Sequence, residues 1–185
     1  MIHFPSDIAV PVWRFGSDEV FTLTPVDSIP DDEAACERLV SICNEQLIYS
    51  FLFNDLLGGE PYSVDHASAW LVWARKGWRE ATHFAFVVVD VNTRIVAACD
   101  IKTSQSVNAE IGYWCSLDAT GVMTNAVQAM LHLAGEAGFR SFQAYTRPDN
   151  VRSARLLRRL GFSQNRSDCP NGRHLYRYRL DQPAP

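Results

Sequence analysis

Three apolar segments rich in β-branched and aromatic residues follow one another near the middle of the chain. They are HFAFVVVD at residues 83–90, RIVAACDIKTS at residues 94–104 and AEIGYWC at residues 109–115. Such runs are typical of strands, and only residues 91–93 separate the first two. Because connections this short join antiparallel neighbours, the sequence predicts an antiparallel meander at the centre of the fold.

The flanking segments predict a larger mixed sheet with helices. Alternation of apolar and polar residues favours a strand at 20–26, and helical spacing favours helices within 31–53 and 64–81. A helix at 122–138, a strand at 141–146, a helix at 150–162 and a strand at 174–180 follow. We therefore expect an α+β fold with a mixed, mostly antiparallel central sheet and helices on both faces.

Composition limits the class of protein. At 185 residues, 47% hydrophobic and 21% charged, the chain is predicted to form one domain over residues 1–185. The net charge of −4 is not concentrated in runs, which argues against nucleic acid or a membrane surface as partner. A leader pattern and an apolar run of about 18 residues are both lacking, so we expect a cytoplasmic protein.

Cysteine and histidine patterns give no sign of a metal site or of disulfides. The cysteines lack CxxC spacing, and we interpret them as core residues of a reducing compartment. The histidines lack metal-ligand spacing, and structural roles are expected for them. These residues are Cys36, Cys43, Cys99, Cys115 and Cys169, and His66, His83, His132 and His174.

Three motifs occur in order along the second half of the chain: AEIGYWC, LDATGVMTNAVQAM and NVRSARLLRRLGF. Together they resemble the GNAT superfamily of acyl-CoA-dependent N-acetyltransferases, in particular its ribosomal-protein-alanine-acetyltransferase-like branch. The resemblance covers residues 20–180 and is strongest over 83–180. It implies acetyl-CoA as co-substrate and direct attack of a primary amine on the thioester, with the acceptor left open between a protein N-terminus and a small-molecule amine.

The resemblance also implies where the cofactor binds. The pantetheine arm pairs with the strand end at residues 113–117, and the pyrophosphate lies on the loop at 118–124, where Asp118 adds a negative charge. Asn150 is expected from its position to cap the helix at 150–162, and the resemblance implies that its side chain also contacts the cofactor arm. The implied cofactor-binding residues are Trp114, Cys115, Ser116, Leu117, Gly121, Val122, Met123, Thr124 and Asn150.

The loop DATGVMT has one glycine and no cation, whereas a G-x-G preceded by Arg or Gln is usual in the family. Arg152 and Arg155 on the predicted helix at 150–162 are therefore expected to supply positive charge to the phosphates, the alternative being a solvated helix face. A second hypothesis is a non-catalytic module that kept the fold after losing its phosphate loop. A nucleic-acid-binding arginine helix is a third and more distant one.

Three residues are expected to serve the chemistry. Ser153 is the first candidate for the general acid that protonates the departing thiolate, and Tyr113 is the second. The position where many relatives of the resembled family carry a tyrosine is Leu157 in this chain. Glu110 is the candidate base for the amine. The alternatives are packing against the sheet for Ser153 and an ion-paired strand residue for Glu110.

Two further expectations are left open. The tryptophans at positions 70, 73 and 78 form either core or a substrate wall. The protein is expected to be a monomer or a homodimer, and a strand edge near the C-terminus could pair two chains.

Overall fold

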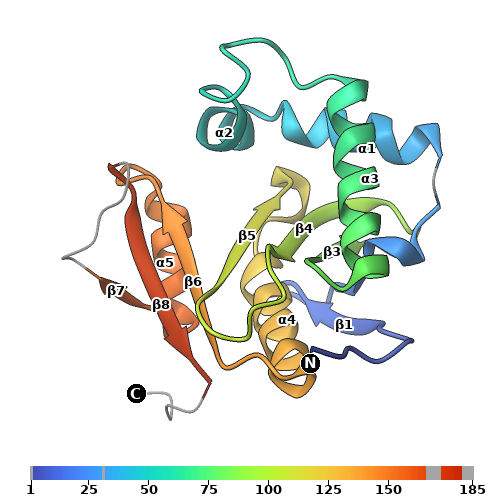
Figure 1. The fold of residues 1–185 in the computed structure, drawn as a ribbon. Coiled ribbons are helices and arrows are strands. Elements are labelled where there is room, and N and C mark those ends of the chain that lie inside the picture. Colours follow the sequence, from blue (N-terminus) through green and yellow to red (C-terminus); the bar gives the residue numbers. More distant parts are fainter. Residues whose placement is uncertain (1, 31, 166–171, 181–185) are drawn as a thin grey trace.

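The computed structural model describes residues 2–30, 32–165 and 172–180, and one mixed sheet organises them. The strand order is β1-β2-β3-β4-β5-β6-β8-β7, antiparallel throughout except between β5 and β6 (Figure 1). The predicted α+β fold and central meander are confirmed. The strands are β1 (Val10–Trp13), β2 (Val20–Pro25), β3 (Phe84–Val89), β4 (Ile95–Ile101), β5 (Ala109–Cys115), β6 (Ser141–Thr146), β7 (Ser163–Asn165) and β8 (His174–Arg179).

Helices cover both faces of the sheet, as predicted. They begin where the sequence offers caps: the Asp32 carboxylate accepts the Ala35 N–H, and Ser63 forms a capping box with His66. The longer helices are α1 (Glu33–Cys43), α3 (Val64–Glu80), α4 (Met123–Ala137) and α5 (Val151–Arg159). Shorter ones are η1 (Val26–Ser28), α2 (Gln46–Ile48), the π-helical η2 (Tyr49–Phe53) and η3 (Leu117–Ala119).

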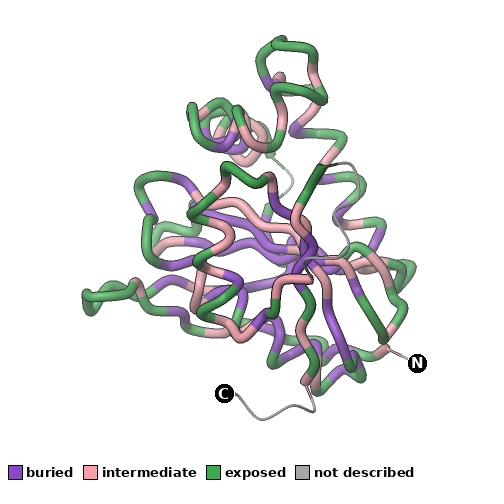
Figure 2. The backbone as a smooth tube through the Cα atoms, turned by 90° about the vertical axis from the view of Figure 1, so that its left-hand side faces the viewer, coloured by how far each residue is buried: buried purple, intermediate pink, exposed green. Residues whose placement is uncertain are grey.

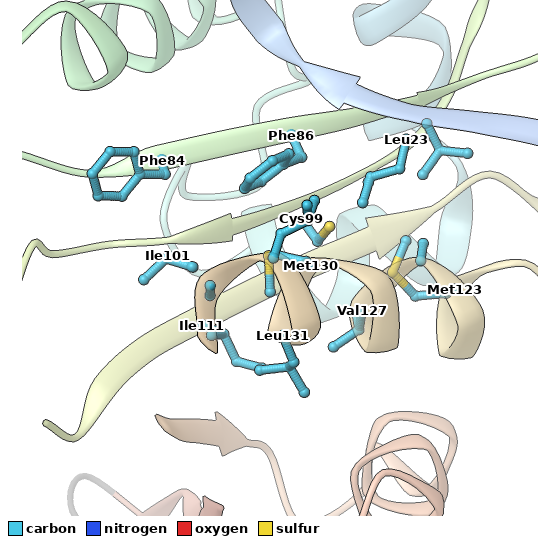
Figure 3. Packing of buried hydrophobic residues seen from close by; sticks show 14 of the residues in the cluster. Leu23, Phe84, Phe86, Cys99, Ile101, Ile111, Met123, Val127, Met130 and Leu131 are labelled. Atoms are coloured by element: carbon cyan, nitrogen blue, oxygen red, sulfur yellow. The ribbon is translucent and has the colours of Figure 1, made fainter. Parts of the chain in front are cut away.

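Two apolar clusters hold the layers together. One joins α4 and α5 to one face of the sheet, with Phe86 and Met130 fully buried (Figure 3). Leu157 of α5 is fully buried in the same cluster. The other joins α1 and α3 to the opposite face around Leu39 and Leu71. The predicted helix at 122–138 is confirmed as α4: most of its apolar positions from Met123 to Ala137 are buried, and it ends at Gly138 in the left-handed region. The most buried residues accordingly lie in the central strands (Figure 2).

The sequence prediction missed β1 and β7. β1 contains Pro11, a residue tolerated in sheets mainly at edges, and among the described strands β1 pairs only with β2. β7 is a three-residue polar segment that pairs with the outer side of β8, so β8 is not the edge of the sheet. Cys169 lies outside the described residues. None of the described helices is both long and apolar enough to cross a membrane.

Candidate active site

β5 and β6 separate after a very short contact. Their parallel pairing consists of Ala109 with Phe142 and Glu110 with Gln143. β5 stays paired with β4 as far as Cys115, and β6 stays paired with β8 as far as Thr146, so the two strands diverge from each other (Figure 1). The facing backbone groups along the divergent part therefore have no ladder partner, and a ligand with amide groups can take that place.

A cleft with a volume of about 460 Å³ occupies the opening between these strands. Its two sides are the end of β5 with the following loop and the end of β6 with α5. The cleft is closed on top by apolar residues of α2 and η2, which we call the roof: Leu47, Ile48, Phe51 and Leu52. In Figure 1, α2 lies above the open end of the two strands.

The roof is attached to both sides of the opening. The Glu45 carboxylate accepts hydrogen bonds from Ser116 Oγ and from the Leu117 N–H, the latter at 2.7 Å, beside the end of β5. On the β6 side, Arg147 pairs with Asp55 at 3.2 Å and lies over the Phe51 ring. These contacts hold the roof across the mouth of the cleft.

The N-terminus of α4 faces the cleft without a side-chain cap. α1, α3 and α5 are capped by Asp32, Ser63 and Asn150, whereas Val122 at the start of α4 provides no side-chain hydrogen bond. The first turn of a helix has N–H groups with no partner inside the helix, together with the positive end of its dipole. Met123 and Thr124 of this turn and Gly121 just before it line the cleft, so an anion there would meet free donors.

The loop before α4 is fixed by the N-terminal part of the chain. Gly121 has φ 103°, and its carbonyl accepts the Phe15 N–H at 3.2 Å. Arg14 donates to the carbonyl of Asp118, and Asn125 Nδ2 donates to Trp13 at 2.7 Å. The carbonyl groups of Asp118 and Gly121, which would repel a nearby anion, therefore accept hydrogen bonds from Arg14 and Phe15.

The negative charge of Asp118 is partly compensated. Its carboxylate lies 3.6 Å from the Arg38 guanidinium and is exposed. Asp118 is also not among the residues that line the cleft. The expected repulsion between this carboxylate and a phosphate in the loop is thereby reduced.

Tyr113 and Ser153 meet across the cleft. Tyr113 Oη lies 2.7 Å from Ser153 Oγ, which links β5 to α5. Asn150 caps α5 by accepting the Ser153 N–H at 3.0 Å, so the backbone of Ser153 is fixed as well. Burial raises the pKa of Tyr113 above its usual range, although the Ser153 hydrogen bond opposes this. Tyr113 therefore keeps its proton near neutral pH.

The two faces of β5 differ because side chains alternate along a strand. Tyr113 and Cys115 pack toward the cluster that contains α4, whereas Trp114 packs toward α3, its ring 6.1 Å from that of Trp70. Glu110 and Gly112 share the parity of Trp114. Glu110 Oε1 accepts a hydrogen bond from Lys102 Nζ at 2.6 Å, so this carboxylate is ion-paired.

Positive charge gathers on the α5 side. Arg152, Arg155, Arg159 and Arg173 all line the cleft, and all four are exposed. Burial and Glu45 raise the pKa of the Cys115 thiol to about 12, while Arg14 and Arg152 act in the opposite sense. The positive charge of Arg152 thus acts on the thiol of Cys115 at the end of β5.

Most of the predicted site residues come together in this cleft. Ser116 and Val122 do not line it, because both are fully buried: Ser116 Oγ donates to Glu45, and Val122 belongs to the core. The predicted residues that do line it are Glu110, Tyr113, Trp114, Cys115, Leu117, Gly121, Met123, Thr124, Asn150, Arg152, Ser153 and Arg155.

Sequence reasoning missed the roof, Lys102, the end of β6, Arg159 and Arg173. Arg159 could have been found, because it lies one helical turn after Arg155. The roof carries no motif, and only the folded chain brings it over the cleft. Trp70, Trp73 and Trp78 do not line the cleft, and Trp78 belongs to the core, where its indole N–H donates to Ala85.

Two of the histidines that we expected to be structural have local partners. The ring of His83 stacks on that of Trp73 with centroids 4.1 Å apart, and His132 lies beside Glu136. The four described cysteines are free. No group of three or more potential metal ligands occurs among the described residues.

Several solved structures have a similar fold. RimJ from Mycobacterium smegmatis in complex with CoA-disulfide is 20% identical, with a TM-score of 0.74 over 96% of this chain and 91% of that chain. The ribosomal-protein-S5-alanine acetyltransferase from Vibrio fischeri is 19% identical, with a TM-score of 0.68 over 95% and 98%. The microcin C7 self-immunity acetyltransferase MccE, bound to acetyl-CoA and AMP, is 17% identical, with a TM-score of 0.66 over 89% and 94%.

An opening between parallel strands with an uncapped helix N-terminus at its mouth suits a ligand that carries both amide groups and phosphates, as acyl-CoA does. The family model described as Acetyltransferase (GNAT) domain matches residues 22–163, so the chain belongs to the GNAT acetyltransferases. The reaction of this family is acetyl transfer from acetyl-CoA to an amine. No curated protein sequence matches the chain significantly.

Proposed function

We propose that this protein acetylates the α-amino group of a protein or peptide N-terminus. The neighbouring structures include enzymes named for ribosomal proteins, which supports a protein acceptor. The exposed apolar side chains of Leu47 and Leu52 in the roof offer a surface for the first residues of such a chain. An α-amine also has a pKa near 8, well below that of lysine, and therefore needs less help to lose its proton.

The observation that carries the proposal is the opening between β5 and β6, with α4 and the arginines at its mouth. Acetyl-CoA would place its pantetheine amides along the unpaired end of β5. Its pyrophosphate would lie at the uncapped N-terminus of α4, between Gly121 and Thr124. Arg152 and Arg155 would replace the cation that the loop lacks. A cleft with these donors argues against the non-catalytic alternative.

Ser153 would protonate the departing thiolate. If the Tyr113 hydroxyl is the hydrogen-bond donor to Ser153 Oγ, the hydroxyl hydrogen of Ser153 is free to point toward the sulfur. Because burial raises the pKa of Tyr113, the phenol acts by orienting Ser153 and does not give up its own proton. Glu110 would contribute negative charge on the opposite face of β5, where the acceptor ammonium arrives.

Mass spectrometry of peptide acetylation tests the proposal. Peptides that begin with Ala or Ser and carry an internal lysine are incubated with protein and acetyl-CoA, beside the same peptides with a formylated N-terminus. We expect one acetyl group on the free N-terminus and none on the formylated peptide. Acetylation of the lysine alone, or of small amines alone, would contradict a protein N-terminus as acceptor.

A cytoplasmic location and the oligomeric state stay predictions from the sequence.

A further inference from the structure

A second carboxylate, that of Asp100, lies behind Gly112, one of the residues that line the cleft. Asp100, near the end of β4, pairs in register with Gly112 of β5. A Cβ atom at position 112 would lie 3.1 Å and 3.2 Å from the two carboxylate oxygens of Asp100. Gly112 lines the cleft and Asp100 does not, so a ligand would reach this carboxylate only past Gly112, where Lys102 Cε also lies 3.2 Å from the same Cβ position.

The carboxylate of Asp100 is also short of hydrogen bonds. Its Oδ1 atom is buried and accepts no hydrogen bond from any described residue. Buried polar atoms almost always have partners, and a buried carboxylate oxygen without one is costly. Purely structural aspartates are normally satisfied, so this atom suggests a role that needs a free acceptor.

The charged groups around Asp100 are Lys102 on its own strand, Glu110 on β5 and His83 before β3. The ammonium of Lys102 is engaged with Glu110 at 2.6 Å, so two carboxylates share one lysine. Burial raises the pKa of Asp100; Lys102, the Gly112 N–H and His83 act against this, and Glu110 adds to it. A carboxylate with a raised pKa is better matched to accepting a proton near neutral pH.

We propose that Asp100, reached past Gly112, is the base that takes the proton from the acceptor ammonium, directly or through one water. This rests on the proposed function. The carboxylate takes one proton from R–NH₃⁺, and the nitrogen lone pair then forms the C–N bond to the thioester carbonyl. The C–S bond breaks with its electron pair on sulfur, and a second nitrogen proton goes to the thiolate by way of Ser153. Asp100 returns its proton to solvent.

In this assignment Glu110 has a different task from the one that its motif position suggests. Its carboxylate is held by Lys102 and lines the cleft, so it attracts the ammonium and does not deprotonate it. Exchange of these roles between Asp100 and Glu110 is the main alternative. The pH dependence of the reaction distinguishes them.

The test uses the full chain with two acceptors: an N-terminal alanine peptide, and hydroxylamine, which is largely unprotonated at neutral pH. Asp100→Asn is expected to lower kcat with the peptide by about 10²–10⁴-fold and to remove the acidic limb of the kcat/KM profile. Acetyl-CoA affinity and transfer to hydroxylamine should stay within about twofold of wild type, which checks the fold of the variant. An equal loss with both acceptors would overturn the assignment.

Two neighbouring variants give an independent check. Glu110→Gln removes a negative charge, which lowers the pKa of Asp100 and moves the acidic limb to lower pH. Lys102→Met removes a positive charge and moves the limb to higher pH. If Glu110→Gln abolishes the limb while Asp100→Asn retains it, Glu110 is the base and the proposal is wrong. A wild-type protein that acetylates neither acceptor overturns the proposed function, and the assignment of Asp100 with it.

Discussion

Tyr113 Oη on β5 and Ser153 Oγ on α5 are 2.7 Å apart, and this hydrogen bond joins the two sides of the opening where the thioester is expected. The two residues are 40 positions apart in the chain. Either oxygen can donate, and the raised pKa of Tyr113 keeps the phenol protonated. This relationship makes Ser153 an oriented hydroxyl at the point where sulfur must be protonated.

Replacement of Ser153 by alanine should lower kcat with little effect on acetyl-CoA affinity. A general acid typically contributes about 10²–10⁴-fold in rate, and we expect a loss in that range. Tyr113→Phe should cause a smaller loss, because it removes orientation and leaves the hydroxyl. Ser163→Ala, on the exposed face of β7, is the matched control and should behave as wild type. An unchanged kcat in Ser153→Ala would exclude this serine as the acid.

Leu157 occupies the position where many relatives carry a tyrosine, but here its side chain is completely buried in the core. Leu157→Tyr should destabilise the protein by about 1–3 kcal/mol, because a larger polar side chain must enter a packed region. Chemical denaturation measures this. The change should also fail to restore activity to Ser153→Ala. Recovery of kcat in the double variant would show that position 157 can reach the thiolate.

The arginines of α5 should contribute to acetyl-CoA binding. Replacement of both Arg152 and Arg155 by alanine is expected to weaken binding by roughly ten- to hundredfold, which is about 1.4–2.8 kcal/mol. Because these side chains are exposed, the effect should shrink at high salt. Arg158→Ala is the control on the same helix, since Arg158 contacts Gln164 and Tyr176 and does not line the cleft. Equal weakening in the control would point to a general charge effect.

The hairpin between β3 and β4 should make stability depend on pH through Asp90. Its carboxylate accepts hydrogen bonds from the Asn92 N–H at 2.9 Å and from the N–H and guanidinium of Arg94. Burial alone would raise the pKa of Asp90, but these hydrogen bonds lower it overall. The stabilisation is therefore present above the unfolded value, about 3.9, and is lost as pH falls through the lower folded value.

Asp90→Asn measures that contribution. We expect it to lower the free energy of unfolding by on the order of 1 kcal/mol at neutral pH, because a neutral amide is the weaker acceptor. The difference from wild type should narrow as the solution becomes more acidic than about pH 4. A difference that is constant down to strongly acid pH would contradict the assigned hydrogen bonds.

Residues with strong local patterns were predictable from the sequence. The bounds of β5 and β6 follow from β-branched and aromatic runs, and Asn150 caps α5 as its position before a helical stripe indicates. Contacts between distant segments were not predictable. Nothing in the spacing shows that Lys102 engages Glu110, that Arg38 lies beside Asp118, or that α2 and η2 cover the cleft. These contacts depend on tertiary packing.

Calorimetric titration with acetyl-CoA tests the central claim most directly, because the cleft between β5 and β6 is assigned to this ligand. We predict saturable binding at one site, strongly weakened in the Arg152→Ala and Arg155→Ala double variant and retained in Arg158→Ala. Absence of heat at millimolar acetyl-CoA, with a protein shown to be folded, would contradict the account.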